Sequence, residues 1–303
     1  MPKLKTTGIV LLWVAATVVS ANLRGDEPKA DAPATQISQL DWMTDYNEAM
    51  ELAQKQRKML LILFCGSEEN PLRDQFESQA LDENEIGSKL ADFVLVRIPL
   101  DATITVNDEP VCISQHDSFH ELKGQEGLAI IYYVHKDAEY YDRVVNVFPL
   151  VPGKYYRYQP EHLSVILDLP PGTLTQRTMV FAVRIHPETP ESTKGEWCSV
   201  LHEEATSHSD YQANIRVQGH HNWGSRFQRI LGRLPAGLLA QEVVAESWPH
   251  EGVVDAAVDC VDSWRQSPGH WSAVRASQPR FGYDMRRGAN GIWYATGLFG
   301  NRH

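Results

Sequence analysis

Two short apolar runs mark the first half of the chain. Residues 59–65 are Met-Leu-Leu-Ile-Leu-Phe-Cys, and residues 93–98 are Phe-Val-Leu-Val-Arg-Ile. Runs of this length are typical of strands buried on both faces of a sheet. The neighbouring segments show helical spacing or form shorter apolar runs. The pattern predicts helices over Thr44–Lys58, from Asn70-Pro71, near Glu83–Ala91, over Ser114–Leu122 and over His162–Leu167, and strands over Leu128–Val134 and Val144–Phe148.

The second half begins after Leu169-Pro170-Pro171-Gly172, which predicts a domain boundary. Apolar residues at helical spacing predict a helix that carries Ala256 and Trp264 and ends at Ser267-Pro268-Gly269. The sequence therefore predicts the α/β class, with domains over residues 36–170 and 178–303. The other elements expected here are a strand over Thr178–Ile185, a long helix from Glu196, a strand over Leu238–Val244, and a closing hairpin of Gly282–Met285 and Ile292–Phe299.

Composition restricts the class of partner. The chain has 303 residues, of which 43% are hydrophobic and 22% charged, as in ordinary globular proteins. Its formal net charge of −11 argues against nucleic acid and anionic membrane surfaces, because both attract basic patches.

The amino terminus predicts export. Lys3 and Lys5 precede an apolar run over Gly8–Val19, and Val19-Ser20-Ala21 offers small side chains for cleavage. That run is shorter than the ~20 residues that span a bilayer. We therefore expect a signal peptide over residues 1–21, a flexible leader over 22–35, and a secreted or periplasmic protein with no membrane span after cleavage.

Residues 37–169 resemble a thioredoxin-like domain. The resemblance includes Trp42 before the first helix, the buried strand that ends at Phe64, and the segment Glu121–Gly127 before the late strands. The redox centre of that family is a C-x-x-C motif, and Gly66–Arg73 stands in its place. Because thiol–disulfide exchange needs two thiols, a thiol-disulfide oxidoreductase is disfavoured.

The carboxyl-terminal half resembles a CAP domain of bacterial type, the SCP or cysteine-rich secretory protein superfamily. The motifs in order are Gly219-His220-His221, Ala240–Ala245 around Glu242, W-x-x-S-P-G-H at 264–270, and W-Y-x-T-G-x-F at 293–299. The resemblance implies an α-β-α sandwich. Val243 replaces the usual asparagine of the family, and the first helix of the family is expected to be shortened or absent.

The resemblance also implies a ligand-binding cleft lined by His220, His221, Glu242, Ser267 and His270. Some members of the family bind a divalent cation there, so His220, Glu242 and His270 are the expected ligands of zinc or calcium. No cofactor is required. Gly219 before His220 favours that histidine over His221. Ser267 stands where the family often has a second acid.

The same resemblance places the helices of Cys198 and Cys260 together, and an oxidising compartment permits a disulfide between them. The alternative is that both thiols stay free and buried.

Two enzymatic patterns have simpler interpretations. His202 and His208 are six residues apart, whereas a metalloprotease helix needs a spacing of four, so a solvated helix face is expected there. Ser267, His270 and Glu242 could form a nucleophilic triad, but Ser267 lacks the G-x-S-x-G context.

The sequence thus favours an exported, non-catalytic binding or scaffolding protein with an unknown extracytoplasmic ligand or protein partner. The alternatives are a weak hydrolase that uses the His/Glu cleft and the disfavoured oxidoreductase.

Overall fold

The computed structural model describes residues 40–302 except 81–85, 107, 152–157 and 160. The expected signal peptide and leader lie outside these residues. Within the described part, no helix combines the length and the apolar character needed to cross a membrane. Mixed helices and strands confirm the α/β class, and residues 39–303 form one compact unit.

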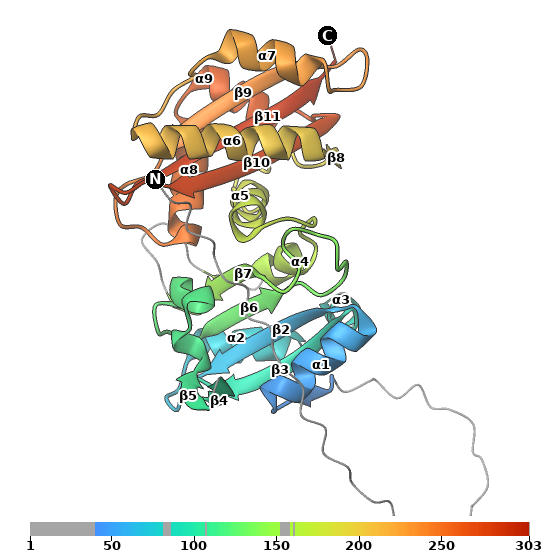
Figure 1. The fold of residues 1–303 in the computed structure, drawn as a ribbon, viewed down its shortest axis with the longest axis vertical. Helices are drawn as coiled ribbons and strands as arrows, with labels where there is room; N and C mark the ends of the chain where they lie inside the picture. Colours follow the sequence, from blue (N-terminus) through green and yellow to red (C-terminus); the bar gives the residue numbers. More distant parts are fainter. Residues whose placement is uncertain (1–39, 81–85, 107, 152–157, 160, 303) are drawn as a thin grey trace, which may run out of the picture. The chain divides into compact units, whose positions relative to one another are not determined.

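The first sheet has the strand order β1-β3-β2-β6-β7 (Figure 1). The first three strands run parallel, and the last two join antiparallel. Alternate residues of the central strand enter different apolar clusters, with Leu61 and Leu63 on one face and Leu60 and Ile62 on the other. This confirms a strand buried on both faces. The strands are β1 (Trp42–Met43), β2 (Met59–Cys65), β3 (Phe93–Pro99), β6 (Gly127–Ile131) and β7 (Val144–Pro149).

The helices of this half begin where the sequence provides caps. The side chain of Asp45 accepts from the backbone N–H of Glu48 at 2.9 Å, and that of Asn70 accepts from Leu72 at 3.0 Å. The expected helix over 114–122 is instead two 3₁₀ helices, η1 (Ile113–Gln115) and η2 (Asp117–Leu122), preceded by an unpredicted hairpin of β4 (Thr103–Val106) and β5 (Glu109–Cys112). The α-helices are α1 (Tyr46–Gln56), α2 (Pro71–Ala80), α3 (Ile86–Leu90) and α4 (Glu161–Leu167).

The second sheet has the order β8-β10-β11-β9 and helices on both faces (Figure 1). Val243 and Phe299 pack on one face with the apolar residues of α8 and α9, whereas Leu298 packs on the other with Leu201 of α6. The strands are β8 (Glu196–Trp197), β9 (Leu239–Glu246), β10 (Arg280–Arg287) and β11 (Trp293–Asn301). The helices are α6 (Ser199–Ile215), α7 (Trp223–Leu231), α8 (Val253–Arg265) and α9 (Pro268–Arg275).

The strand predicted over Thr178–Ile185 is wrong, because these residues belong to helix α5 (Leu174–Arg184). Thr173 and Gln176 form a reciprocal capping box that starts the helix directly after the Pro-Pro-Gly segment. Buried Met179 and Val183 then pack into the core. Capping and packing outweigh the strand preference of the β-branched residues.

Buried polar contacts join the two halves. Arg177 of α5 is 1% exposed; its Nε donates to Asn146 Oδ1 of β7 at 2.6 Å, and its Nη1 donates to the carbonyl oxygens of Leu169 and Pro170. The rings of Phe148 and Phe181 lie 4.6 Å apart, and a single apolar cluster contains residues of both sheets. The boundary at residues 169–172 thus separates two sheets that share a core.

We expect Arg177→Met to lower the free energy of unfolding by about 3 kcal/mol, because it leaves a buried amide and two carbonyl oxygens without their donor. Urea unfolding followed by tryptophan fluorescence measures this. Arg184→Met on the same helix is the control and should cost no more than about 1 kcal/mol, since its guanidinium is partly exposed. Equal losses of unfolding free energy in the two variants would contradict the conclusion that the buried contacts of Arg177 link the two halves.

Candidate functional site

The predicted site residues come from three segments. His220 and His221 lie in the loop between α6 and α7, Glu242 lies in β9, and His270 lies in the first turn of α9. Ser267 is the N-cap residue of α9, which begins with Pro268. The sheet and its two layers of helices bring His220, Glu242 and His270 into one group.

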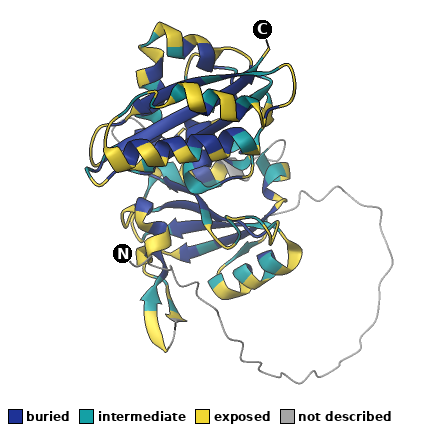
Figure 2. Cartoon of the chain, turned by 45° about the horizontal axis from the view of Figure 1, so that its top comes forward, coloured by how far each residue is buried: buried dark blue, intermediate teal, exposed yellow. Residues whose placement is uncertain are grey.

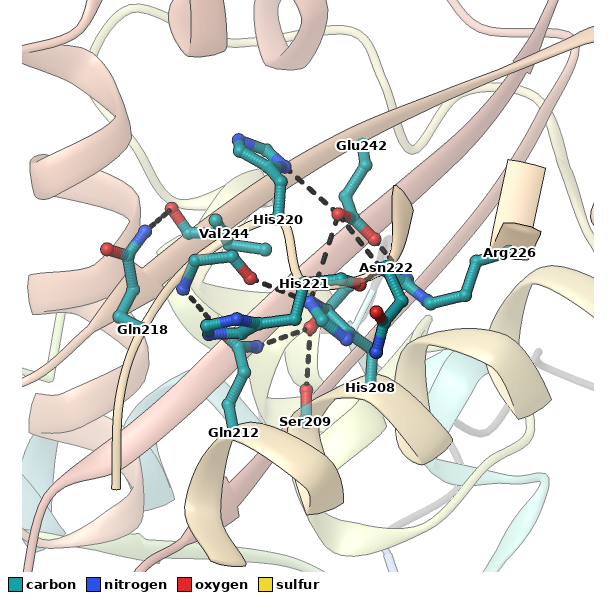
Figure 3. Close-up of polar contacts among 12 residues, drawn as sticks. His208, Ser209, Gln212, Gln218, His220, His221, Asn222, Arg226, Glu242 and Val244 are labelled. Atoms are coloured by element: carbon teal, nitrogen blue, oxygen red, sulfur yellow. Dashed lines mark hydrogen bonds and ion pairs between the residues drawn. The ribbon is translucent and has the colours of Figure 1, made fainter. Parts of the chain in front are cut away.

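His220 connects the other two residues. Its Nδ1 lies 3.0 Å from Glu242 Oε1, and its Nε2 lies 3.3 Å from His270 Nε2. Figure 3 shows the first of these contacts, with the imidazole of His220 beside the carboxylate of Glu242. The carboxylate of Glu242 and the imidazole of His270 are thus linked through the ring of His220.

Arg226 belongs to none of the sequence motifs, yet it forms an ion pair with Glu242. Its Nη1 donates to Oε1 at 3.1 Å and its Nη2 donates to Oε2. The side chains of both residues are almost fully buried. Burial raises the pKa of Glu242, but hydrogen bonds from His220 and Arg226 and the charge of Arg226 lower it further, so the pKa lies below its ordinary value. Glu242 is therefore ionised.

The ionised Glu242 determines the tautomer of His220. A carboxylate can only accept hydrogen bonds, so the neutral imidazole carries its proton on Nδ1 and donates it to Glu242. The Nε2 atom of His220 then has a lone pair that faces His270. Burial, followed by the neighbouring His220, lowers the pKa of His270 despite the charge of Glu242. Burial and His220 thus outweigh the charge of Glu242, which by itself would raise this pKa.

His208 is a second member of the site for which the sequence predicted a different environment. Its Nε2 lies 2.9 Å from the carbonyl oxygen of Gly219 and 3.9 Å from Glu242 Oε1. Both His202 and His208 are only 2% exposed, so the predicted solvated face of α6 is wrong at these positions. The sheet packs against one side of α6, and the carbonyl oxygen of Gly219 in the loop after the helix contacts His208. Other residues of α6 stay exposed, so buried and exposed positions alternate along the helix (Figure 2).

His221 and Ser267 take no direct part in the group. The Nε2 atom of His221 lies 3.2 Å from the carbonyl oxygen of Val217, and its ring contacts Tyr211. Ser267 makes no side-chain capping bond, and its carbonyl oxygen accepts from the N–H of Trp271. No hydrogen bond among the described residues joins Ser267 to His270 or Glu242. The arrangement resolves the choice between the adjacent histidines in favour of His220.

Glu242 does not complete a set of three ligands. Its two oxygens are held by Arg226 and His220, and the described residues include no group of three or more His, Cys, Asp or Glu side chains placed to hold a metal ion. His220 Nε2 and His270 Nε2 are the two donor atoms that face each other.

The predicted disulfide is also not formed, since all four cysteines are free. Cys198 packs with the α6 face of the second sheet, whereas Cys260 is buried in the cluster on the other face. The sheet therefore lies between the two thiols.

In the first half, the carboxylate of Glu126 binds the segment Gly66–Arg73, which stands in place of the C-x-x-C motif. Its carboxylate accepts from the N–H of Gly66, from Asn70 Nδ2 at 2.7 Å and from Arg73 Nη1 at 2.8 Å. Burial raises the pKa of Cys65, at the end of β2, to about 11. This thiol is thus protonated at neutral pH, and a protonated thiol is a poor nucleophile.

Comparisons with known proteins add little. No family model matches the chain, and no curated protein matches it. Among solved structures, it is similar to an outer surface protein from Borrelia burgdorferi, with 21% identity, 36% of this chain and 78% of that chain covered, and a TM-score of 0.30. Overlap at this level assigns neither a fold nor a family.

We expect no disulfide reductase activity, because Cys65 has no partner thiol in a C-x-x-C motif and is protonated at neutral pH. Insulin reduction by the purified protein with dithiothreitol should proceed at the rate without protein. Turnover above that rate, abolished by Cys65→Ser, would contradict this prediction.

Stability should fall in acid because of His202. Burial lowers the pKa of His202 to about 3, against ~6.5 in the unfolded chain. Its contribution is fully present above ~6.5 and is lost as the pH falls toward about 3. Between pH 7 and pH 5 the wild type should lose about 2 kcal/mol through this residue alone.

The measurement is urea unfolding at both pH values. His202→Phe should retain stacking on Trp197 and lose this part of the pH dependence. Replacement of the exposed His135 by Phe is the control and should keep the wild-type dependence. Identical pH dependence in the wild type and His202→Phe would show that the buried histidine is not the source.

Proposed function

We propose that the protein is an exported, non-catalytic binding module whose second half holds a divalent cation, zinc by preference, between His220 and His270. The observation that carries the proposal is the 3.3 Å separation of the two Nε2 atoms. Two ligands at ~2.0–2.1 Å from a tetrahedral zinc ion are separated by ~3.3 Å. The two Nε2 atoms are therefore already as far apart as two ligand atoms of a tetrahedral zinc ion.

The tautomer supports the same proposal. Because His220 donates its Nδ1 proton to Glu242, its Nε2 atom has a lone pair, which accepts from Nε2 of His270 and which a bound cation would use instead. A carboxylate that accepts from the second nitrogen of a metal-binding histidine is a common arrangement around zinc. Imidazole donors favour zinc over calcium, which prefers oxygen ligands. Of the two ions expected from the sequence, zinc fits this pair of side chains better.

Accessibility supports a role in binding. The side chain of His220 is 44% exposed, and two histidines occupy only two of the four positions around a tetrahedral ion. When bound, zinc would offer its remaining positions to water or to an external ligand. A serine hydrolase needs a nucleophile within hydrogen-bond reach of its base, and the contacts of Ser267 give that alternative no support.

The strand orders support the two resemblances. Three parallel strands extended by two antiparallel ones are what a thioredoxin-like domain implies, and a sheet between helical layers is what a CAP domain implies. Gly66–Arg73 provides no thiol pair, so the first half serves as a structural or partner-binding platform. The predicted signal segment supports a secreted or periplasmic location.

Zinc binding by the purified protein, prepared without a polyhistidine tag, tests the proposal. A competition titration with a chromophoric chelator should give 1:1 binding, and His220→Ala and His270→Ala should each weaken it at least ~10-fold. His221→Ala is the matched control, because that ring faces Val217, and it should bind as the wild type does. Absence of binding, or equal losses in all three variants, would refute the two-histidine site.

A further inference from the structure

We propose that Arg226 weakens the cation site by neutralising Glu242, and so sets the site to bind its ion reversibly; this inference rests on the proposed function. Arg226 contacts neither His220 nor His270 through any described hydrogen bond. Its action is on the carboxylate, both of whose oxygens it binds. It is therefore a tuning residue and not a ligand.

The charges at the site explain the direction of the effect. Glu242 is the acidic group that contacts His220, and its charge would attract a cation held on the far side of that ring. The guanidinium of Arg226 is buried with the carboxylate, so water screens neither charge effectively. The pair is close to neutral, and most of the attraction that Glu242 would exert on a cation is cancelled.

Hydrogen bonding acts in the same direction. A carboxylate behind a metal-binding histidine strengthens that ligand by accepting its second proton. Oε1 of Glu242 accepts from Arg226 Nη1 at 3.1 Å as well as from His220 Nδ1 at 3.0 Å. An oxygen that is shared with a cationic donor is a weaker acceptor for His220. The imidazole is then a weaker ligand than it would be beside an unshared carboxylate.

The local structure holds Arg226 in this position. The residue lies in the first turn of α7, where its N–H donates to the carbonyl oxygen of Asn222, the N-cap residue. Its guanidinium lies 5.5 Å from the ring of Trp223, and Nη1 also approaches the carbonyl oxygen of His221 at 3.4 Å. The loop that presents His220 therefore leads directly into the turn that presents Arg226. Figure 3 shows His220 and Arg226 on different sides of Glu242.

A double-mutant cycle tests the inference with zinc chloride as the probe. Arg226→Met should tighten zinc binding at least ~10-fold in the wild-type background, because it leaves the charge of Glu242 unbalanced. The double variant Glu242→Gln/Arg226→Met has no charge on either side chain, so it should bind zinc about as the wild type does, in which the pair is already close to neutral. Visible absorption of the cobalt(II) forms reports whether the ligands have changed, independently of affinity.

The outcomes separate this inference from the proposed function. If the wild type binds zinc through His220 and His270 but Arg226→Met binds equally or more weakly, the role of Arg226 is refuted and the site stands. If no variant binds zinc, the proposed function fails. A double variant that binds zinc as tightly as Arg226→Met would also overturn the inference, because the gain would not depend on the carboxylate.

A second variant covers the case in which Arg226→Met does not fold, since a buried carboxylate without its partner is destabilising. Glu242→Gln alone leaves the charge of Arg226 unbalanced beside the histidines. It should weaken zinc binding at least ~10-fold. Unchanged affinity in this variant would refute the coupling between the ion pair and the cation. Circular dichroism of each variant confirms that the comparison is made between folded proteins.

Discussion

The second half of the protein depends on a sheet face that is polar and yet buried under helix α6. Asp284 is fully buried, and its carboxylate accepts from Thr175 at 2.6 Å, from Thr206 and from Arg286 at 2.8 Å. Thr296 on the adjacent strand accepts from α6 in the same way. Buried polar groups must be paired, so α6 can occupy only a position that satisfies them. Because α6 ends beside the loop of His220, this requirement also fixes the place of the site.

The helices and strands that could be predicted from the sequence are those whose residue pattern is compatible with only one type of secondary structure. Met59–Cys65 is apolar throughout and bounded by polar residues, so only a strand with both faces covered suits it. The apolar stripe of α8 could only end at Ser267-Pro268-Gly269, although the helix α9 that begins at Pro268 was not predicted. Thr178–Ile185 had two solutions, because its β-branched residues suit a strand while a capping box five residues earlier suits a helix. Tertiary packing decided between them, and a local pattern carries no information about packing partners.

The residues of the candidate site also differ in whether the sequence could predict them. The types of residue at 220, 242 and 270 could be selected from motifs, and the structure brings these three together. Arg226 could not, since an arginine in the first turn of a helix is ordinarily solvated, and its pairing with Glu242 depends on how α7 packs against β9. The burial of His208 could not be predicted either. Helix α6 has polar residues around its circumference, and the face covered by the sheet is itself polar.

The shared core has a consequence for how the chain acquires its structure. Residues 40–151 contain every strand of the first sheet, yet Asn146 and Phe148 on β7 are covered only when α5 packs against them. The carboxylate of Glu121 likewise accepts from the N–H of Val253, which the ribosome supplies 132 residues later. A nascent chain can therefore complete the contacts of its first sheet only after α5, and later Val253, has been synthesised.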